Sequence, residues 1–111
     1  MQEQKYSIKT WPKDDRPREK LRSRGAQQLS DSELLAILIR NGARKRSAVD
    51  LAKDLLSLGK NSLNTLARFG VRDFMQVSGI GEAKAITISA ALELGRRRQV
   101  LSAPEKLVVR S

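Results

Sequence analysis

A short glycine turn is the feature that most constrains how this chain can fold. It occupies Val77–Ala85 and contains Gly79 and Gly81, with Ile80 between them. Glycine adopts positive φ without a steric penalty, so the backbone can reverse within a few residues, while Ile80 can anchor the turn in an apolar core. A short helical pattern precedes this turn and a long one follows it. The sequence therefore predicts a helix-hairpin-helix.

The start of the second helix of this motif is a candidate anion site. The first N–H groups of a helix beginning near Glu82 have no partner within the helix, and they lie at the positive end of its dipole. A phosphate oxygen is a suitable ligand for the amides near Ala83, and Lys84 can add a charge-assisted contact. The alternative is that the turn is only a structural corner between two helices.

Charge gives a second indication of the partner. The chain has 111 residues, with 22 Lys and Arg against 12 Asp and Glu, a formal net charge of +10. An excess of this size favours a polyanionic partner, and a basic, solvated surface is the alternative interpretation. The absence of cysteine and histidine excludes disulfides, thiolate metal sites and imidazole-based catalysis.

The expected organisation is a single all-α domain. Neither a signal peptide nor a membrane span is evident, so we expect a soluble, cytoplasmic protein without a membrane partner. Residues 1–15 are predicted to form an extended arm whose apolar residues, Tyr6, Ile8 and Trp11, lie on the helical body. Residues 16–100 form the helical domain, and residues 101–111 form a linker or tail.

Helix boundaries follow from caps and apolar periodicity. Asp15 is expected near the N-cap of a first helix that has proline in its first turn and ends by Gly25, and Ser30 with Glu33 has the spacing of a capping box. Ser47 is expected to cap another helix that Gly59 stops. The predicted helices cover about residues 16–24, 33–39 (buried), 47–58, 63–68, 71–77 and 82–98. The last carries two apolar stripes, one of Ala83, Ile86, Ala90 and Leu94, the other of Ala85, Ile88 and Leu92.

The first half of the chain has the same outline as the second. Helix 33–39, turn 40–46 and helix 47–58 correspond to helix 71–77, turn 78–81 and helix 82–98, which suggests a degenerate paired helix-hairpin-helix. Turn 40–46 contains four cations, Arg40, Arg44, Lys45 and Arg46. Either these cations follow the phosphates of the same duplex as the glycine turn, or the turn is a solvated basic loop.

Several stretches resemble one family, the N-terminal domain of the bacterial RadC-like proteins, which carry a DNA repair label. The stretches are Trp11-Pro12, Arg16-Pro17-Arg18-Glu19-Lys20-Leu21, Gly25-Ala26, Leu29 to Leu38, Ser47 to Ala52, Gly79 to Ala85 and Ala91 to Arg97. The resemblance covers nearly the whole chain. It implies a helix-hairpin-helix module that precedes a C-terminal JAB/MPN metalloprotease-like domain. None of that second domain is expected here, so the chain is interpreted as a truncated fragment.

Catalysis by these residues is not expected. The chain also resembles DNA glycosylases of the endonuclease III type, but the position of their lysine nucleophile holds Ala83, Lys84 is one residue further on, and no aspartate follows Asp73. Asp50 and Asp54, four residues apart, have the spacing of a solvated helix face rather than of a Mg²⁺ site. We therefore expect no catalytic residue, no metal site and no cofactor.

The sequence thus predicts a non-catalytic module that binds DNA weakly, through its phosphates and without sequence specificity. The expected contacts are Gly79, Ile80, Gly81, Ala83 and Lys84 from one turn, and Arg44, Lys45 and Arg46 from the other. The alternative function is a protein-interaction or docking domain that serves the absent metal-dependent hydrolase-like domain. Convergence of the two turns on one face would favour DNA, and an exposed apolar patch around Trp11, Leu101 or Leu107 would favour a protein partner.

Overall fold

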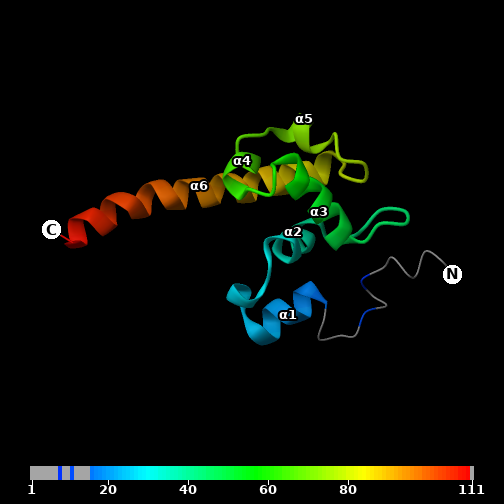
Figure 1. Cartoon of the computed structure of the whole chain (residues 1–111), viewed down its shortest axis with the longest axis horizontal. Coiled ribbons are helices and arrows are strands. Elements are labelled where there is room, and N and C mark those ends of the chain that lie inside the picture. Colours follow the sequence, from blue (N-terminus) through cyan, green and yellow to red (C-terminus); the bar gives the residue numbers. More distant parts are fainter. Residues whose placement is uncertain (1–7, 9–10, 12–15, 111) are drawn as a thin grey trace.

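The computed structural model describes residues 8, 11 and 16–110, with side chains described as far as residue 100. The described part is helical, as expected, and contains no strand (Figure 1). In chain order the helices are α1 (Pro17–Arg24), a 3₁₀ helix (Ala26–Gln28), α2 (Asp31–Ile39), α3 (Ala48–Leu58), α4 (Leu63–Leu66), α5 (Val71–Phe74) and α6 (Glu82–Arg110).

The two central helices begin at serine capping boxes. Ser30 Oγ accepts from the Glu33 backbone N–H at 3.2 Å, and the Ser30 N–H donates to Glu33 Oε1 at 2.9 Å. Ser47 and Asp50 repeat this arrangement at the start of α3, with distances of 3.1 and 3.0 Å. The predicted capping roles of Ser30 and Ser47 are therefore confirmed, and both follow from contacts within four residues.

Of the two outermost helix ends, one was predicted wrongly. The N-cap of α1 is Arg16, whose side chain makes no capping hydrogen bond, and Pro17 lies in the first turn as expected; Asp15, expected near this cap, lies outside the described residues. At the other end of the chain, α6 continues to Arg110 instead of ending near Arg98. The expected stop of α1 at Gly25 is confirmed, since Gly25 has φ +88° and its N–H donates to the Leu21 carbonyl.

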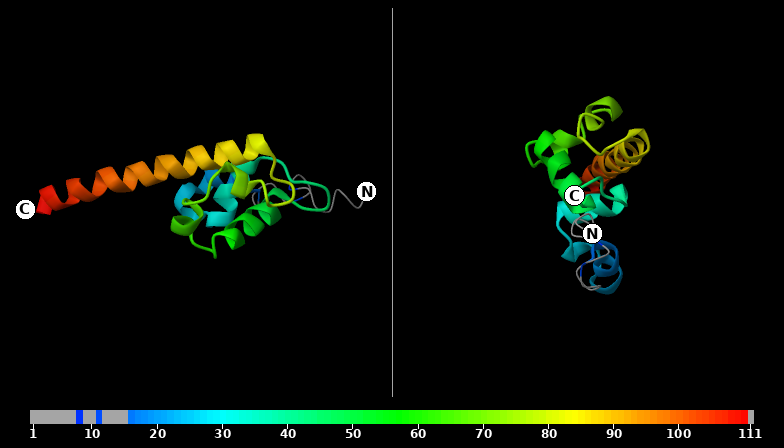
Figure 2. Two further views of the ribbon diagram at one scale, coloured as in Figure 1. Left: turned by 90° about the horizontal axis from the view of Figure 1, so that it is seen from above. Right: turned by 90° about the vertical axis from the view of Figure 1, so that its right-hand side faces the viewer.

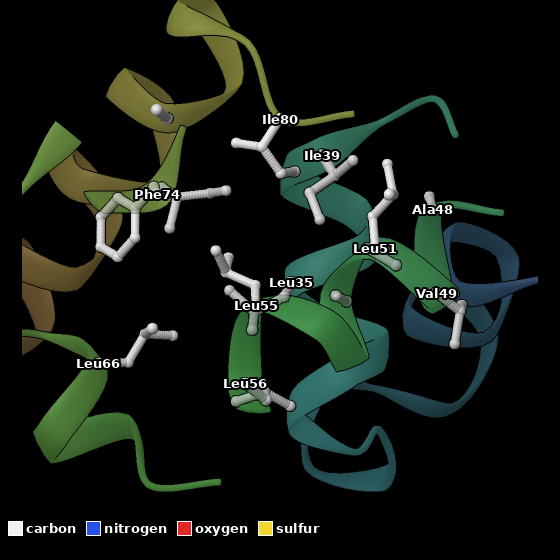
Figure 3. Close-up of a cluster of buried hydrophobic side chains, with 14 residues drawn as sticks. Leu35, Ile39, Ala48, Val49, Leu51, Leu55, Leu56, Leu66, Phe74 and Ile80 are labelled. Atoms are coloured by element: carbon white, nitrogen blue, oxygen red, sulfur yellow. The ribbon is translucent and has the colours of Figure 1, made fainter. Parts of the chain in front are cut away.

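One hydrophobic core unites α2 to α6. Its fully buried large side chains come from five helices and are Ile39, Leu51, Leu55, Leu66, Phe74 and Ile88 (Figure 3). α2 packs against α3, and α6 packs against both α2 and α5. Leu35, Ala36 and Ile39 of α2 are buried, so the prediction of a central helix here is confirmed.

Only one of the two apolar stripes on α6 faces this core. Ala85 and Ile88 are completely buried and Leu92 packs against the cluster. The other stripe is solvent-exposed, with Ile86 52% and Leu94 69% accessible. α6 packs against α2 and α5, and the stripe of Ala85, Ile88 and Leu92 is the one that joins the core in this packing.

The C-terminal part of α6 projects away from the body (Figures 1 and 2). Residues 94–100 are all exposed. Ion pairs between side chains of the helix itself form where this exposed part begins. Glu93 accepts from Arg96 at 2.7 Å and from Arg97 at 2.9 Å, and these hydrogen bonds lower the pKa of Glu93 to about 2. Such pairs three and four residues apart support an exposed helix. Within the described residues, no helix has the length and apolarity needed to cross a membrane.

Two residues of the predicted N-terminal arm are described. Ile8 and Trp11 are half-buried and pack against the core cluster, as expected for apolar residues of an arm lying on the body. The Trp11 N–H donates to the Ile8 carbonyl at 2.9 Å, so the backbone turns here. Tyr6 lies outside the described residues.

Candidate functional site

The turn between α5 and α6 depends on Gly79. Its φ of +95° is a conformation that other residues rarely adopt. A Cβ at this position would lie 2.8 Å from Ala43 Cβ and 2.9 Å from Leu51 Cδ2, closer than carbon atoms pack. Ile80, the next residue, is buried in the core, as the sequence predicted. The glycine turn is thus packed closely against α3 and against turn 40–46.

Gly81 serves a different purpose from Gly79. Its carbonyl accepts from the Ala85 N–H at 3.0 Å, which makes Gly81 the residue preceding the first turn of α6. Glycine offers no side-chain oxygen to the next N–H groups, whereas Ser47 caps α3. A Cβ at Gly81 would meet nothing within 4 Å, and Glu82 and Ala83 are exposed. The backbone is therefore open at the start of α6.

Turn 40–46 is a tight two-residue reversal with a cationic tip. Ala43 and Arg46 exchange two backbone hydrogen bonds, of 2.9 and 3.1 Å, and Arg44 and Lys45 lie between them. All three side chains from Arg44 to Arg46 are exposed. A Cβ at Gly42 would overlap the Arg46 carbonyl oxygen, so glycine is required at the base of this turn.

Among the three cations expected to contact DNA from this turn, Arg46 differs from Arg44 and Lys45 in being directed toward α3. Arg46 Nη2 donates to Asp54 Oδ2 at 2.6 Å and to the Asp50 carbonyl at 3.4 Å, which draws its guanidinium toward α3. Asp50 in turn belongs to the Ser47 capping box. Asp50 and Asp54, the two carboxylates that the sequence assigned to a solvated helix face, thus both have protein partners. The tip of the turn consists of Arg44 and Lys45.

Lys84 joins the two turns. Its ammonium group donates to the Asn41 carbonyl at 2.9 Å and to the Gly79 carbonyl at 3.4 Å. Together with the close approach of Gly79 to Ala43, this contact brings the glycine turn and turn 40–46 to the same end of the molecule, opposite the C-terminus (Figures 1 and 2). The sequence did not anticipate this bridging role of Lys84, because its two acceptors are backbone carbonyls, one of them 43 residues away.

A groove of about 780 Å³ separates turn 40–46 from the start of α1. Its cations are Arg16, Arg18, Arg40, Arg44, Lys45 and Arg46, and Glu19 is the only carboxylate among its described lining residues. Apolar side chains, including Ile37 and Pro17, also line it. Of these cations, Arg16 and Arg18 were absent from the predicted site, and Arg40 was counted among the cations of turn 40–46 but not among the expected contacts. The Arg16-Pro17-Arg18 segment at a helix start is a basic cluster that can be recognised in the sequence. Its position beside turn 40–46 cannot, because it depends on how α1 packs.

An ion pair fixes the position of α1 beside α2, and so the shape of the groove. Lys20 Nζ lies 2.9 Å from Glu33 Oε2, and both side chains are largely buried. The hydrogen bond from the Ser30 backbone N–H and, to a smaller extent, the one from the Lys20 ammonium group hold the pKa of Glu33 below its ordinary value. Among the described residues, no group of three or more acidic side chains is arranged to hold a metal ion.

Comparison with known proteins identifies relatives over most of the chain. Residues 8–86 match the family model described as UPF0758 N-terminal. A UPF0758 protein of Flavobacterium johnsoniae is 52% identical over 94 residues, which cover 85% of this chain and 41% of the relative. A UPF0758 protein of Rubrobacter xylanophilus is 47% identical over 107 residues, which cover 96% of this chain and 47% of the relative. The chain thus spans less than half the length of these relatives. No solved structure matches.

Proposed function

The chain belongs to the UPF0758 family, and we propose that this N-terminal domain binds the phosphate backbone of DNA without sequence specificity. Two neighbouring turns make the contacts. The tip of turn 40–46 supplies the positive charge of Arg44 and Lys45, and the glycine turn supplies the open backbone amides at the start of α6. In this interpretation, α5, the glycine turn and α6 form the helix-hairpin-helix that the resemblance to the RadC-like proteins implies, and α2 and α3 form its degenerate copy.

The observation that carries this proposal is the bridge between the turns. Lys84 donates to Asn41, 43 residues away, and to Gly79, so two segments distant in sequence meet at one end of the molecule. Adjacent cations and unpaired helix N–H groups suit successive phosphates of one strand. A surface made of charge and backbone donors, without side chains arranged to read base edges, suits sequence-independent binding.

Weak affinity is expected from the same geometry. Glu82 lies exposed in the first turn of α6, close to the place of the proposed phosphate, and Asp54 already compensates Arg46. Lys84 uses part of its hydrogen-bonding capacity on the two carbonyls, so its contribution to phosphate binding is indirect. It positions the turns and adds charge beside them.

An NMR titration of this chain with a short unspecific duplex at two salt concentrations tests the proposal. The amides of residues 40–46 and 79–85 are expected to shift, and the affinity is expected to fall steeply with salt because bound counterions are released. The double variant Arg44→Gln, Lys45→Gln is expected to reduce the slope of log K against log salt by about 2, one for each lost phosphate contact. Lys60→Gln, Arg98→Gln removes the same charge from exposed positions, one just beyond the C-terminal end of α3 and one on the projecting part of α6, and is the matched control.

Gly81 provides a second test that leaves the charge unchanged. Gly81→Ser introduces a hydroxyl that accepts from the open N–H groups, as Ser47 does in α3. We expect this variant to be more stable than Gly81→Ala by about 1 kcal/mol and to bind the duplex less tightly. Silence of both turns in the titration, or equal losses in the Arg44/Lys45 variant and its control, would reject specific use of the turns.

A docking role is the second candidate, and the exposed stripe of α6 is the observation that favours it. Ile86 and Leu94 present apolar surface, and the relatives extend well beyond the matched region. If the domain has this role, shifts on adding the separately produced C-terminal part of a UPF0758 relative will follow the Ile86 and Leu94 face, and those with DNA will be scattered over basic residues.

A further inference from the structure

We propose that the groove between α1 and turn 40–46 binds an unpaired nucleotide, so that the domain prefers DNA with a single-stranded extension to a continuous duplex. The proposal rests on the proposed function in one respect: the tip of turn 40–46, which forms one wall of the groove, also contacts the adjoining duplex. The groove itself involves residues that duplex binding does not require.

The lining of the groove combines two kinds of surface. Arg16 and Arg18 at the start of α1 face Arg40 and the cationic turn 40–46, while the half-buried Ile37 of α2 and Ile8 supply apolar surface. Ala36 and Pro17, which are buried, form the base beneath this lining, so the apolar part belongs to the body of the protein.

Such a lining suits an unpaired nucleotide better than a duplex. A duplex keeps its bases stacked inside and offers phosphates and sugars, so apolar surface gains little from it. An unpaired nucleotide offers a base face and a phosphate together, and bases pack on apolar and guanidinium surfaces while cations hold the backbone. The volume of about 780 Å³ lies within the range of small-ligand sites, which is large enough for a nucleotide.

The position of the groove connects it to the duplex site. Arg44, Lys45 and Arg46 belong both to the groove wall and to the turn that Lys84 joins to the glycine turn. A strand whose paired part lies across the two turns therefore reaches the groove where its pairing ends. The Lys20–Glu33 ion pair joins α1 to α2 and so fixes the wall of the groove that carries Arg16 and Arg18.

Fluorescence anisotropy with three labelled probes tests this inference. The probes are a blunt duplex, the same duplex with a short unpaired thymidine extension at either end, and the extension strand alone. The wild-type chain is expected to bind the extended duplex about tenfold more tightly than the blunt one, the effect of about one well-packed base. Arg18→Gln, Arg40→Gln is expected to abolish this preference and to affect blunt duplex no more than the control Lys60→Gln, Arg98→Gln.

A second variant separates the apolar contribution from charge. Ile37→Asn keeps the net charge and removes apolar surface from the groove, so it is also expected to reduce the preference, while thermal unfolding verifies that the variant is folded. Equal binding of blunt and extended duplex by the wild type would overturn the inference. Competition by polyglutamate as effective as that by the single strand would also overturn it, since the groove would then recognise charge alone.

The experiment distinguishes failure of the groove from failure of the duplex site. If Arg44→Gln, Lys45→Gln leaves blunt-duplex binding unchanged while Arg18→Gln, Arg40→Gln abolishes binding of the extension strand, the proposed duplex function fails and the groove stands. If the wild type binds duplex through the turns without any preference for the extension, the proposed function stands and the groove assignment fails.

Discussion

The two turns at the end of this molecule reverse the chain by different means. Turn 40–46 is closed by backbone hydrogen bonds between Ala43 and Arg46 and carries its charge outward. The glycine turn lies against its neighbour, with Gly79 facing Ala43 and Leu51 and with Ile80 in the core. One turn therefore supplies cations and the other supplies packing and open amides. If the proposed function holds, the two turns divide between them the two requirements of phosphate binding, positive charge and open backbone amides.

Loss of Gly79 is expected to break this arrangement most severely. In Gly79→Ala the residue must keep a φ of +95° and its Cβ must push Ala43 and Leu51 apart, so we expect a loss of about 3 kcal/mol in the free energy of unfolding. Chemical denaturation measures it. Gly81→Ala, two residues away in open space, is the matched control, with an expected loss of about 0.5 kcal/mol. Similar losses in both variants would mean that the turns are not packed together.

Removal of the Lys84 bridge is expected to loosen the contact between the turns, with a smaller loss in the free energy of unfolding than Gly79→Ala. Lys84→Met keeps the aliphatic stem but leaves the Asn41 and Gly79 carbonyls without the ammonium donor, at a cost of about 1 kcal/mol. The Asn41 and Gly42 amide signals should move. Lys53→Met, at an exposed position of α3, is the control and should stay within about 0.5 kcal/mol of wild type. Unchanged amide signals at Asn41 and Gly42 in Lys84→Met would contradict the bridge.

The helix that leads into turn 40–46 has a titratable cap that α6 lacks. The pKa of Glu33 is lowered by the Ser30 N–H and by Lys20, so its stabilising effect is complete above its ordinary value of 4.5 and is lost as the pH falls through the lowered pKa. Glu33→Gln should be less stable than wild type at neutral pH, by up to about 1 kcal/mol, and the difference should shrink in acid. Unfolding curves at several pH values measure this. A difference that grows toward acid pH would have the wrong sign.

The Arg46–Asp54 ion pair is expected to have the smallest effect on stability. Both side chains are nearly half exposed, so Asp54→Asn should change the free energy of unfolding by less than about 0.5 kcal/mol. The variant releases Arg46 toward the tip of the turn and removes a negative charge, and duplex affinity should rise about twofold. A fall in affinity would mean that Asp54 orients the turn for binding.

Features that depend on near neighbours could be predicted from the sequence. The capping boxes of Ser30 with Glu33 and Ser47 with Asp50 close within four residues, and Gly25 ends α1 through one local hydrogen bond. The burial of Ile80 also followed from its place between two glycines. These contacts do not depend on how distant segments pack, so their residue types and spacing were sufficient.

Features that depend on which elements pack against a helix face could not be predicted from the sequence. The two stripes of α6 are similarly apolar, and only packing against α2 and α5 decides that Ile88 is buried and Ile86 exposed. The same limit applies to the groove, since Arg18 and Arg40 are 22 residues apart and meet only because α1 returns to α2.

By itself, then, the sequence determined an all-α chain, its serine caps, its glycine reversals and its strong positive charge, because each of these depends on composition or on a few adjacent residues. Only the tertiary structure decided that Lys84 donates to the Asn41 carbonyl, that Arg46 pairs with Asp54, and that cations from α1 and turn 40–46 surround one groove. The physical reason is that these contacts join separate segments, whose relative positions follow from the burial of a shared core.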